Sequence, residues 1–188
     1  MSLSQLDERT ALIVIDLQKG TVALPSSPYP VGEVINRAAE LARSFRERGL
    51  PVVLVNVTGG APGRTDSGRR KSASLPADWA ELVPELDAHP NDYIITKQRP
   101  GAFIGTNLND YLQQHSVTQV VLAGVATSIG VESTARSAYD YGYNVTFVID
   151  AMADRDPDTH RHCIVKIFPR LGETATNDEV LRLLNERP

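Results

Sequence analysis

Ala11-Leu-Ile-Val-Ile-Asp16 is a run of five apolar residues that ends in an acid. Short runs of this kind, without polar alternation, are typical of strands that are buried on both faces of a parallel sheet. Similar runs recur along the chain, and stretches with helical spacing separate most of them, as in Val34, Ala38 and Leu41. This alternation predicts βαβ units and therefore an α/β fold.

The patterns predict six strands and five helices. We expect strands over residues 11–16, 51–56, 92–97, 120–124, 145–149 and 173–175. We expect helices over residues 33–48, 107–115, 131–141, 158–168 and 177–185. The predicted architecture is a three-layer sandwich in one domain, residues 1–188, with a six-stranded, mostly parallel, doubly wound sheet and helices on both faces.

Residues 58–78 interrupt this pattern, because the segment is rich in Gly, Arg and Ser and has no periodicity. A loop of about twenty residues inside a compact domain is commonly a lid, an interface element or a disordered segment. All three interpretations stay open here. Trp79, at the end of this segment, is a candidate to approach a site.

Composition restricts the partners of this chain of 188 residues. Its net charge is −4, and Lys and Arg are scattered rather than clustered. We therefore expect neither nucleic acid nor a membrane surface as partner, because both select for basic patches. No apolar run approaches the ~20 residues that cross a bilayer, and the first ten residues include acids. We expect a cytoplasmic protein that binds a small molecule or another protein.

Candidate functional residues follow the ends of the predicted strands. Asp16 closes the first strand, Lys97 closes the third, and residues 124–130 lead from the fourth into a helix through small residues. Ligands of open parallel sheets bind beyond the carboxyl ends of the strands. A carboxylate and an ammonium in one partly dry cleft shift each other's ionisation, and helix N-terminal amides favour an anion. These residues therefore predict a reactive or anion-binding site.

Each of these residues also has a purely structural interpretation. An Asp at a strand end commonly accepts backbone amides, which is the interpretation that we favour for Asp150. Lys97 alone is more typically solvated, with its stem along apolar surface. The segment 124–130 also fits a tight turn that needs glycine for backbone room.

Three segments together resemble the signatures of the isochorismatase-like, or cysteine hydrolase, superfamily. They are Val14-Ile-Asp-Leu-Gln18, Thr96-Lys-Gln-Arg-Pro-Gly-Ala-Phe103 and Ala123-Gly-Val-Ala-Thr-Ser-Ile-Gly-Val-Glu-Ser-Thr-Ala-Arg136. The resemblance spans roughly residues 8–180. It implies a three-layer α/β hydrolase, a homo-oligomer, and an Asp, Lys, Cys triad of the kind found in the amidases of the family.

The resemblance also implies roles for single residues. Asp16 corresponds to the acid or base, and Lys97 to the lysine that tunes its charge. A non-proline cis peptide is implied before Ala126, and an oxyanion hole is implied from the amides of Ala126 and Gly130. We add three further candidates to line the pocket: Gln18, Arg99 and Phe103.

Gly130 stands where the family carries its nucleophilic cysteine. Glycine has no atom that can attack, so we expect covalent amidase chemistry to be lost. The resemblance implies that isochorismatases of the family also carry glycine here, and that their aspartate protonates a vinyl ether before water adds. Small residues at 126–128 replace the larger groups of their pocket. We therefore predict a hydrolase for another small carboxylated or carbonyl metabolite, with Asp16 as general acid or base.

Neither a metal nor a cofactor is expected. Metal-binding nicotinamidases of the family carry Asp-x-His after the second strand, where this chain has Asn56-Val-Thr58. His160 and His162 lie two residues apart on a predicted helix and face different directions. Cys163, in the middle of the same helix, is predicted to be a buried apolar cysteine rather than a second nucleophile.

Two alternatives remain open. The first is a serine hydrolase, because residues 126–130 form an Ala-x-Ser-x-Gly variant of the nucleophile elbow around Ser128. The acid and the base of such a triad follow in the required order, as Asp150 or Asp154 and then His160 or His162. The second is a catalytically inactive pseudoenzyme that keeps the ligand-binding pocket, since Gly130 removes the nucleophile.

Overall fold

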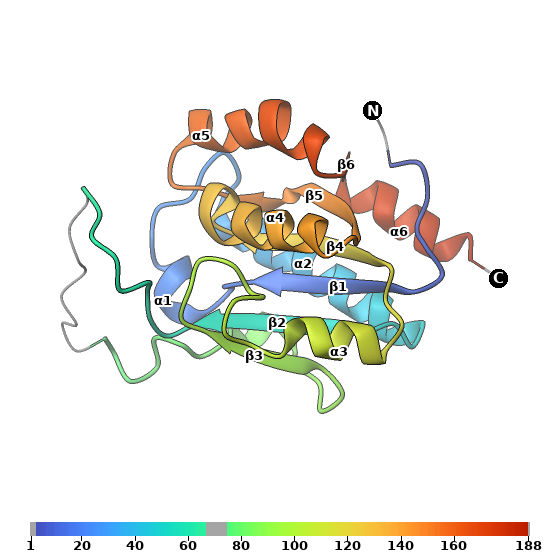
Figure 1. Ribbon diagram of the computed structural model, residues 1–188, viewed down its shortest axis with the longest axis horizontal. Coiled ribbons are helices and arrows are strands. Elements are labelled where there is room, and N and C mark those ends of the chain that lie inside the picture. Colours follow the sequence, from blue (N-terminus) through green and yellow to red (C-terminus); the bar gives the residue numbers. More distant parts are fainter. Residues whose placement is uncertain (1–2, 67–74, 188) are drawn as a thin grey trace.

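The computed structural model describes residues 3–66 and 75–187 (Figure 1). Within these residues, six strands form one sheet in the order β3-β2-β1-β4-β5-β6, and every neighbouring pair is parallel. The strands are β1 (Thr10–Ile15), β2 (Val52–Val57), β3 (Tyr93–Lys97), β4 (Gln119–Val125), β5 (Asn144–Ala153) and β6 (Glu173–Ala175). The predicted doubly wound α/β sheet is confirmed, and the described strands are all parallel.

The α-helices are α1 (Lys19–Val22), α2 (Val31–Glu47), α3 (Leu108–Gln114), α4 (Glu132–Asp140), α5 (Pro157–His162) and α6 (Asn177–Asn185). Shorter helical turns are η1 (Pro84–Leu86), η2 (Thr127–Val131), η3 (Cys163–Ile167) and η4 (Phe168–Arg170), of which η2 and η3 are π-helical. The predicted helix over 158–168 is divided into α5, η3 and η4. Pro169 has no backbone N–H to continue an α-helix, so the chain tightens into a 3₁₀ turn there.

Alternate residues of β1 divide the core into two halves. Leu12 and Val14 pack on the face that α2 and α6 cover, whereas Ile13 and Ile15 pack on the face that α3 and α4 cover. Side chains of successive strand residues point to opposite faces, so a strand that is apolar throughout must be buried on both sides. All six residues of β1 are buried. The helices therefore form the outer layers of the predicted sandwich (Figure 1).

β5 is longer than predicted and passes through Asp150. Its pairing with β4 shifts between Leu122 and Gly124, where an irregularity absorbs extra residues of β5. The Asp150 carboxylate accepts a hydrogen bond from the amide of Asn177 at the start of α6 (2.8 Å), which confirms the structural interpretation of this acid. The carboxyl end of β5 is therefore Ala153, and the residues that follow it reach the edge of the sheet.

The described residues include no helix long and apolar enough to cross a bilayer. Part of the unusual loop over 58–78, residues 67–74, lies outside the described residues. The lid and interface interpretations of that loop therefore stay predictions.

Candidate active site

Asp16 turns the chain away from the sheet at the carboxyl end of β1. Its backbone has a φ of 53°, in the left-handed region that Asp tolerates better than most residues. The amide of Asp16 donates to the carbonyl of Val55 (2.8 Å), and the hydroxyl of Thr21 donates to the carbonyl of Asp16. These bonds hold the turn, so the carboxylate projects beyond the edge of the sheet.

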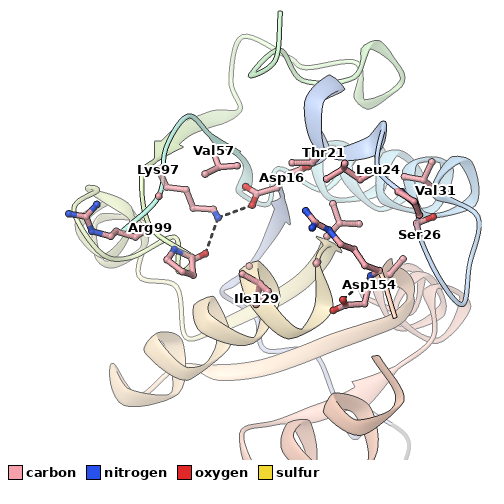
Figure 2. A pocket seen from close by; sticks show the side chains of 18 of the residues that line it. Asp16, Thr21, Leu24, Ser26, Val31, Val57, Lys97, Arg99, Ile129 and Asp154 are labelled. Atoms are coloured by element: carbon pink, nitrogen blue, oxygen red, sulfur yellow. Dashed lines mark hydrogen bonds and ion pairs between the residues drawn. The ribbon is translucent and has the colours of Figure 1, made fainter. Parts of the chain in front are cut away.

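Lys97 is the last residue of β3, and its side chain is 2% exposed. Its ammonium lies 2.7 Å from Oδ2 of Asp16 and donates a second hydrogen bond to the carbonyl of Pro100 (2.8 Å), as Figure 2 shows. Because β2 lies between β1 and β3, the lysine reaches across the end of a strand to form this ion pair. The two side chains that the sequence analysis singled out therefore meet.

Burial dominates the ionisation of Asp16. Removal of the carboxylate from water raises its pKa from 3.8 to about 6, although the charge and the hydrogen bond of Lys97 act in the opposite direction. The second carboxylate oxygen, Oδ1, is buried and makes no hydrogen bond to the described residues. A carboxyl group with a pKa near neutrality and a free oxygen can give or take a proton at physiological pH.

The segment after β4 approaches β1 closely. Gly124 has a φ of 111°, and a Cβ there would lie 2.1 Å from the carbonyl oxygen of Ile15, so only glycine fits. The peptide between Val125 and Ala126 is cis, as the family resemblance implies. η2 begins directly after Ala126 and brings its first turn to the same edge of the sheet as Asp16.

Gly130 lies within η2, is buried, and faces Asp16. A Cβ built on Gly130 would lie 3.3 Å from Oδ2 of Asp16 and 2.8 Å from Cγ2 of Ile15. The backbone of residue 130 is therefore next to the carboxylate, and the side chain of Ile15 partly fills the space that a side chain at this position would need. No nucleophilic atom is present at residue 130.

A cavity of about 400 Å³ opens over these residues. Apolar side chains form much of its wall, and Figure 2 shows Asp16 and Lys97 together on one side of it. Five of the seven predicted site residues line it: Asp16, Lys97, Arg99, Ala126 and Gly130. The remaining wall comes from Thr21, Leu24, Pro25, Ser26, Val31, Val57, residues 59–61, Pro100, Val125, Ile129, Ala153, Asp154 and Arg155.

The structure places Gln18 and Phe103 elsewhere. The buried amide of Gln18 donates to the carbonyls of Val57 and Trp79, both at 2.9 Å, and accepts from the amide of Val57 (2.6 Å). Gln18, which follows β1, thus connects the end of β2 to the turn that contains Trp79. Phe103 is buried beside Tyr141 and Tyr143. Neither residue, nor Trp79, is among the described residues that line the cavity.

Asp154 and Arg155 line the cavity, although neither residue was predicted from the sequence to bind substrate. The carboxylate of Asp154 accepts hydrogen bonds from the amides of Ser128 (2.7 Å) and Arg155 (2.8 Å). One amide at the start of η2 is therefore already occupied by a protein carboxylate. The guanidinium of Arg155 makes no hydrogen bond or ion pair with the described residues. A prediction that β5 ends at Ala153 would have placed Asp154 and Arg155 at the carboxyl edge of the sheet and so among the candidate site residues.

Arg99 lies at the rim of the cavity. Its Nη1 donates to the carbonyl of Gln98 (2.9 Å), and Figure 2 shows its guanidinium directed away from the Asp16–Lys97 pair. A partly exposed arginine at the rim acts on a ligand mainly through long-range attraction, which solvent and salt weaken.

The position of His160 does not support its role as the base of the serine hydrolase alternative. Nδ1 of His160 lies 2.8 Å from the hydroxyl oxygen of Thr127 rather than beside Ser128. His160 is buried, and burial lowers its pKa, which keeps the ring neutral. The amide of Ser128 is held by Asp154. Thr127 and His160 therefore form a hydrogen-bonded pair that fixes the first turn of η2 against α5.

Cys163 is buried, as predicted, and is not among the described residues that line the cavity. Its thiol donates to the carboxylate of Glu132 (3.2 Å), and burial together with that carboxylate raises the pKa of Cys163 to about 12. A thiol in this state is a poor nucleophile. No three His, Cys, Asp or Glu side chains of the described residues are grouped as metal ligands.

Comparisons with known proteins agree with this geometry. The isochorismatase domain family matches residues 10–179. YwoC, an uncharacterised isochorismatase family protein of Bacillus subtilis, is 41% identical over 180 residues, which cover 93% of each chain. A solved isochorismatase family protein from Burkholderia thailandensis has a TM-score of 0.93 at 39% identity and covers 98% of this chain and 100% of that one.

A relative with a named activity is more distant. Maleamate amidohydrolase of Pseudomonas putida is 27% identical over 185 residues, which cover 94% of this chain and 87% of that protein. The extent of the family match and the similarity to the Burkholderia structure lead to one conclusion. The chain belongs to the isochorismatase family of hydrolases.

Proposed function

We propose that this protein hydrolyses a small carboxylated or carbonyl metabolite without a covalent enzyme intermediate. The observation that carries this proposal is the state of Asp16. Its carboxyl group is buried beside Lys97, has one oxygen without a partner among the described residues, and faces a glycine instead of a thiol. Such a group can exchange a proton with substrate or water, and residue 130 offers no side-chain nucleophile for it to activate.

The proposed reaction uses water as the nucleophile. Asp16 transfers a proton to or from the reacting atoms, while the ammonium of Lys97, which donates to Oδ2, stabilises the ionised form of the carboxylate. The oxygen of water bonds to the substrate carbon, and the leaving group departs with a proton. The amides of Ala126 and Gly130 hold the polar head of the substrate, where negative charge develops.

Arg155 is the proposed partner for an anionic group on the substrate. It lines the cavity, and its guanidinium has no anionic partner within the described residues. Guanidinium groups bind carboxylates through paired hydrogen bonds. The named activity of the Pseudomonas relative concerns maleamate, an amide that carries a carboxylate, which agrees with a substrate of this class.

Turnover of a panel of enol ethers and small amides, each with and without a carboxylate, tests the proposal. We expect the wild type to act on carboxylated members, and Asp16→Asn to lower kcat by about 10²–10⁴-fold. Asp150→Asn is the matched control, because that acid holds α6 and is not among the residues that line the cavity. Its kcat should stay within about twofold of the wild type. Equal losses in the two variants would contradict the assignment.

The pH dependence of kcat/KM identifies the role of Asp16. If the ionised carboxylate acts first as a base, activity falls as the pH drops below about 6, since protonation removes the acceptor. If the protonated form acts first as an acid, activity falls as the pH rises above about 6. A profile that is flat from pH 5 to 8 would exclude both roles.

A pseudoenzyme is the second candidate, and the absence of a nucleophilic atom at Gly130 favours it. In this case the protein binds carboxylates in the cavity and turns over no member of the panel. Assembly into a homo-oligomer and a cytoplasmic location are further proposals, which rest on the family resemblance and on composition.

A further inference from the structure

Asp154 joins three walls of the cavity through four hydrogen bonds. The backbone N–H and carbonyl of Asp154 both pair with Ser27, at 2.8 and 2.7 Å. Its carboxylate accepts from the amide of Ser128 through Oδ2 (2.7 Å) and from the amide of Arg155 through Oδ1 (2.8 Å). One buried residue therefore connects the loop before α2, the first turn of η2 and Arg155.

Each of these three partners belongs to a segment that lines the cavity. Leu24–Ser26 form one wall, Ala126 and Gly130 form another, and Arg155 contributes a cation. Hydrogen bonds to an ionised acceptor are roughly twice as strong as neutral ones, so the carboxylate is an effective clamp. Both of its oxygens are occupied by backbone amides. Asp154 therefore holds the walls and leaves proton transfer to Asp16.

We propose that Asp154 is a positioning residue that sets the selectivity of the cavity for anionic ligands. It fixes the backbone of Arg155 at a constant separation from the amides of Ala126 and Gly130. A ligand with an anionic group at Arg155 then places its polar head at those amides. This inference rests on the proposed function, in which Arg155 binds the anionic group of the substrate.

The substitution Asp154→Asn tests the clamp and leaves the backbone bonds to Ser27 possible. The two amides face different oxygens of Asp154, and Asn replaces one of these oxygens with an NH₂ donor, so the amide of Ser128 or that of Arg155 loses its acceptor. Benzoate and benzamide are suitable probes, because they share a shape and differ in charge. Their affinities are measured by chemical-shift titration of the whole chain in solution.

We expect Asp154→Asn to weaken benzoate binding at least fivefold and to change benzamide binding less than twofold. Loss of the negative charge of Asp154 would by itself strengthen the binding of the benzoate anion. Weaker binding would therefore show that Arg155 is no longer held in position. Arg155→Gln should weaken benzoate at least tenfold. The double variant should be within twofold of Arg155→Gln, since Asp154 acts through Arg155. Benzoate binding in Asp154→Asn that equals or exceeds the wild type overturns the proposal.

Asp156→Asn is the matched control two residues away. Asp156 accepts the amide of Thr159 at the start of α5 (2.7 Å), is exposed, and does not line the cavity. We expect its benzoate affinity to stay within twofold of the wild type. A loss as large as that in Asp154→Asn would show that the effect is a general consequence of losing a helix-end acceptor, and would overturn the proposal.

A measurement on the wild type covers the case in which Asp154→Asn does not fold. The amide hydrogens of Ser128 and Arg155 should exchange slowly with solvent, because both donate to a buried carboxylate. Rapid exchange of both would overturn the clamp. Neither the binding nor the exchange experiment requires turnover, so the failure of every substrate in the panel would count against the proposed function alone.

Discussion

Two buried carboxylates, Asp16 and Asp154, line the same cavity at the ends of two strands, and their surroundings differ. Asp154 gives both oxygens to backbone amides. Asp16 gives one oxygen to Lys97 and keeps the other without a hydrogen bond to the described residues. A carboxylate whose oxygens all accept hydrogen bonds holds the structure in place. A carboxylate beside a cation with one oxygen that accepts no hydrogen bond can still bind a proton or a ligand. The difference lies in the partners, since the residue type is the same.

The largest expected effect comes from removing the cation that balances Asp16. We expect Lys97→Met to lower the free energy of unfolding by about 3–5 kcal/mol at pH 8, because it leaves a buried carboxylate without its partner. At pH 5 the loss should be smaller, since the carboxyl group is then largely protonated. Urea unfolding at the two pH values measures both losses.

Lys19→Met is the matched control for this experiment. Lys19 forms ion pairs with Asp78 and Glu81 in which every side chain is more than 40% exposed. Such pairs contribute little to stability, so no measurable change is expected. An equal loss for Lys97→Met at pH 5 and pH 8 would show that the two carboxylates do not differ in the way described.

The next effect in size is the pH dependence that Asp16 adds to stability. Its pKa is higher in the folded protein, so the folded state binds more protons than the unfolded state between about pH 4 and 6. The contribution is complete below pH 4 and is lost as the pH rises through 6. A shift of about two pKa units corresponds to at most about 3 kcal/mol.

Unfolding of the wild type and of Asp16→Asn from pH 4 to 7 isolates this contribution. The advantage of the wild type should shrink by up to that amount as the pH rises, because Asn does not titrate. Asp150→Asn serves again as the control at another site. A wild-type advantage that grows with pH would reverse the sign and contradict a raised pKa for Asp16.

The smallest expected effect concerns the glycine that faces Asp16. Gly130→Ala should destabilise the fold by about 1–3 kcal/mol, since its Cβ would lie 2.8 Å from Ile15 and 3.1 Å from the carbonyl oxygen of Val125. In Gly32→Ala, by contrast, the new methyl group meets nothing within 4 Å on α2, and helix propensity favours alanine by up to about 1 kcal/mol. Thermal unfolding compares the two. A neutral or stabilising Gly130→Ala would show that the space beside Asp16 is open.

The sequence was sufficient for the sheet and for the central ion pair. Apolar runs identified the central strands, such as β1 and β4, because strands buried on both faces leave little room for other residue types. β6 is a short segment, Glu173–Ala175, that is only partly apolar. Parallel order then places every carboxyl end on one edge, which is why the approach of Asp16 and Lys97 was predictable. α1 was not predictable, since four residues are too few to show a period.

The other residues of the site could not be predicted, because some polar side chains form hydrogen bonds within the protein and do not face the cavity. Gln18 has a residue type and position suited to a pocket, yet its amide is used by backbone groups. Asp150 looked like the end of β5 because it is the first acid after an apolar run, whereas the irregular pairing with β4 carries the strand three residues further. For this reason Asp154 was considered only as the acid of a serine triad, and Arg155 was not considered. Which polar groups pair inside the protein is visible only in the three-dimensional structure.

The ion pair also makes the site a reporter of completed folding. Asp16 and Lys97 are 81 positions apart and come from strands that do not touch each other, with β2 inserted between them. The ammonium reaches the carboxylate only when three strands have assembled in the native order. The burial that raises the pKa of Asp16 to about 6 likewise requires the finished sheet, and in a partly assembled chain this acid would have the ordinary pKa of an exposed aspartate.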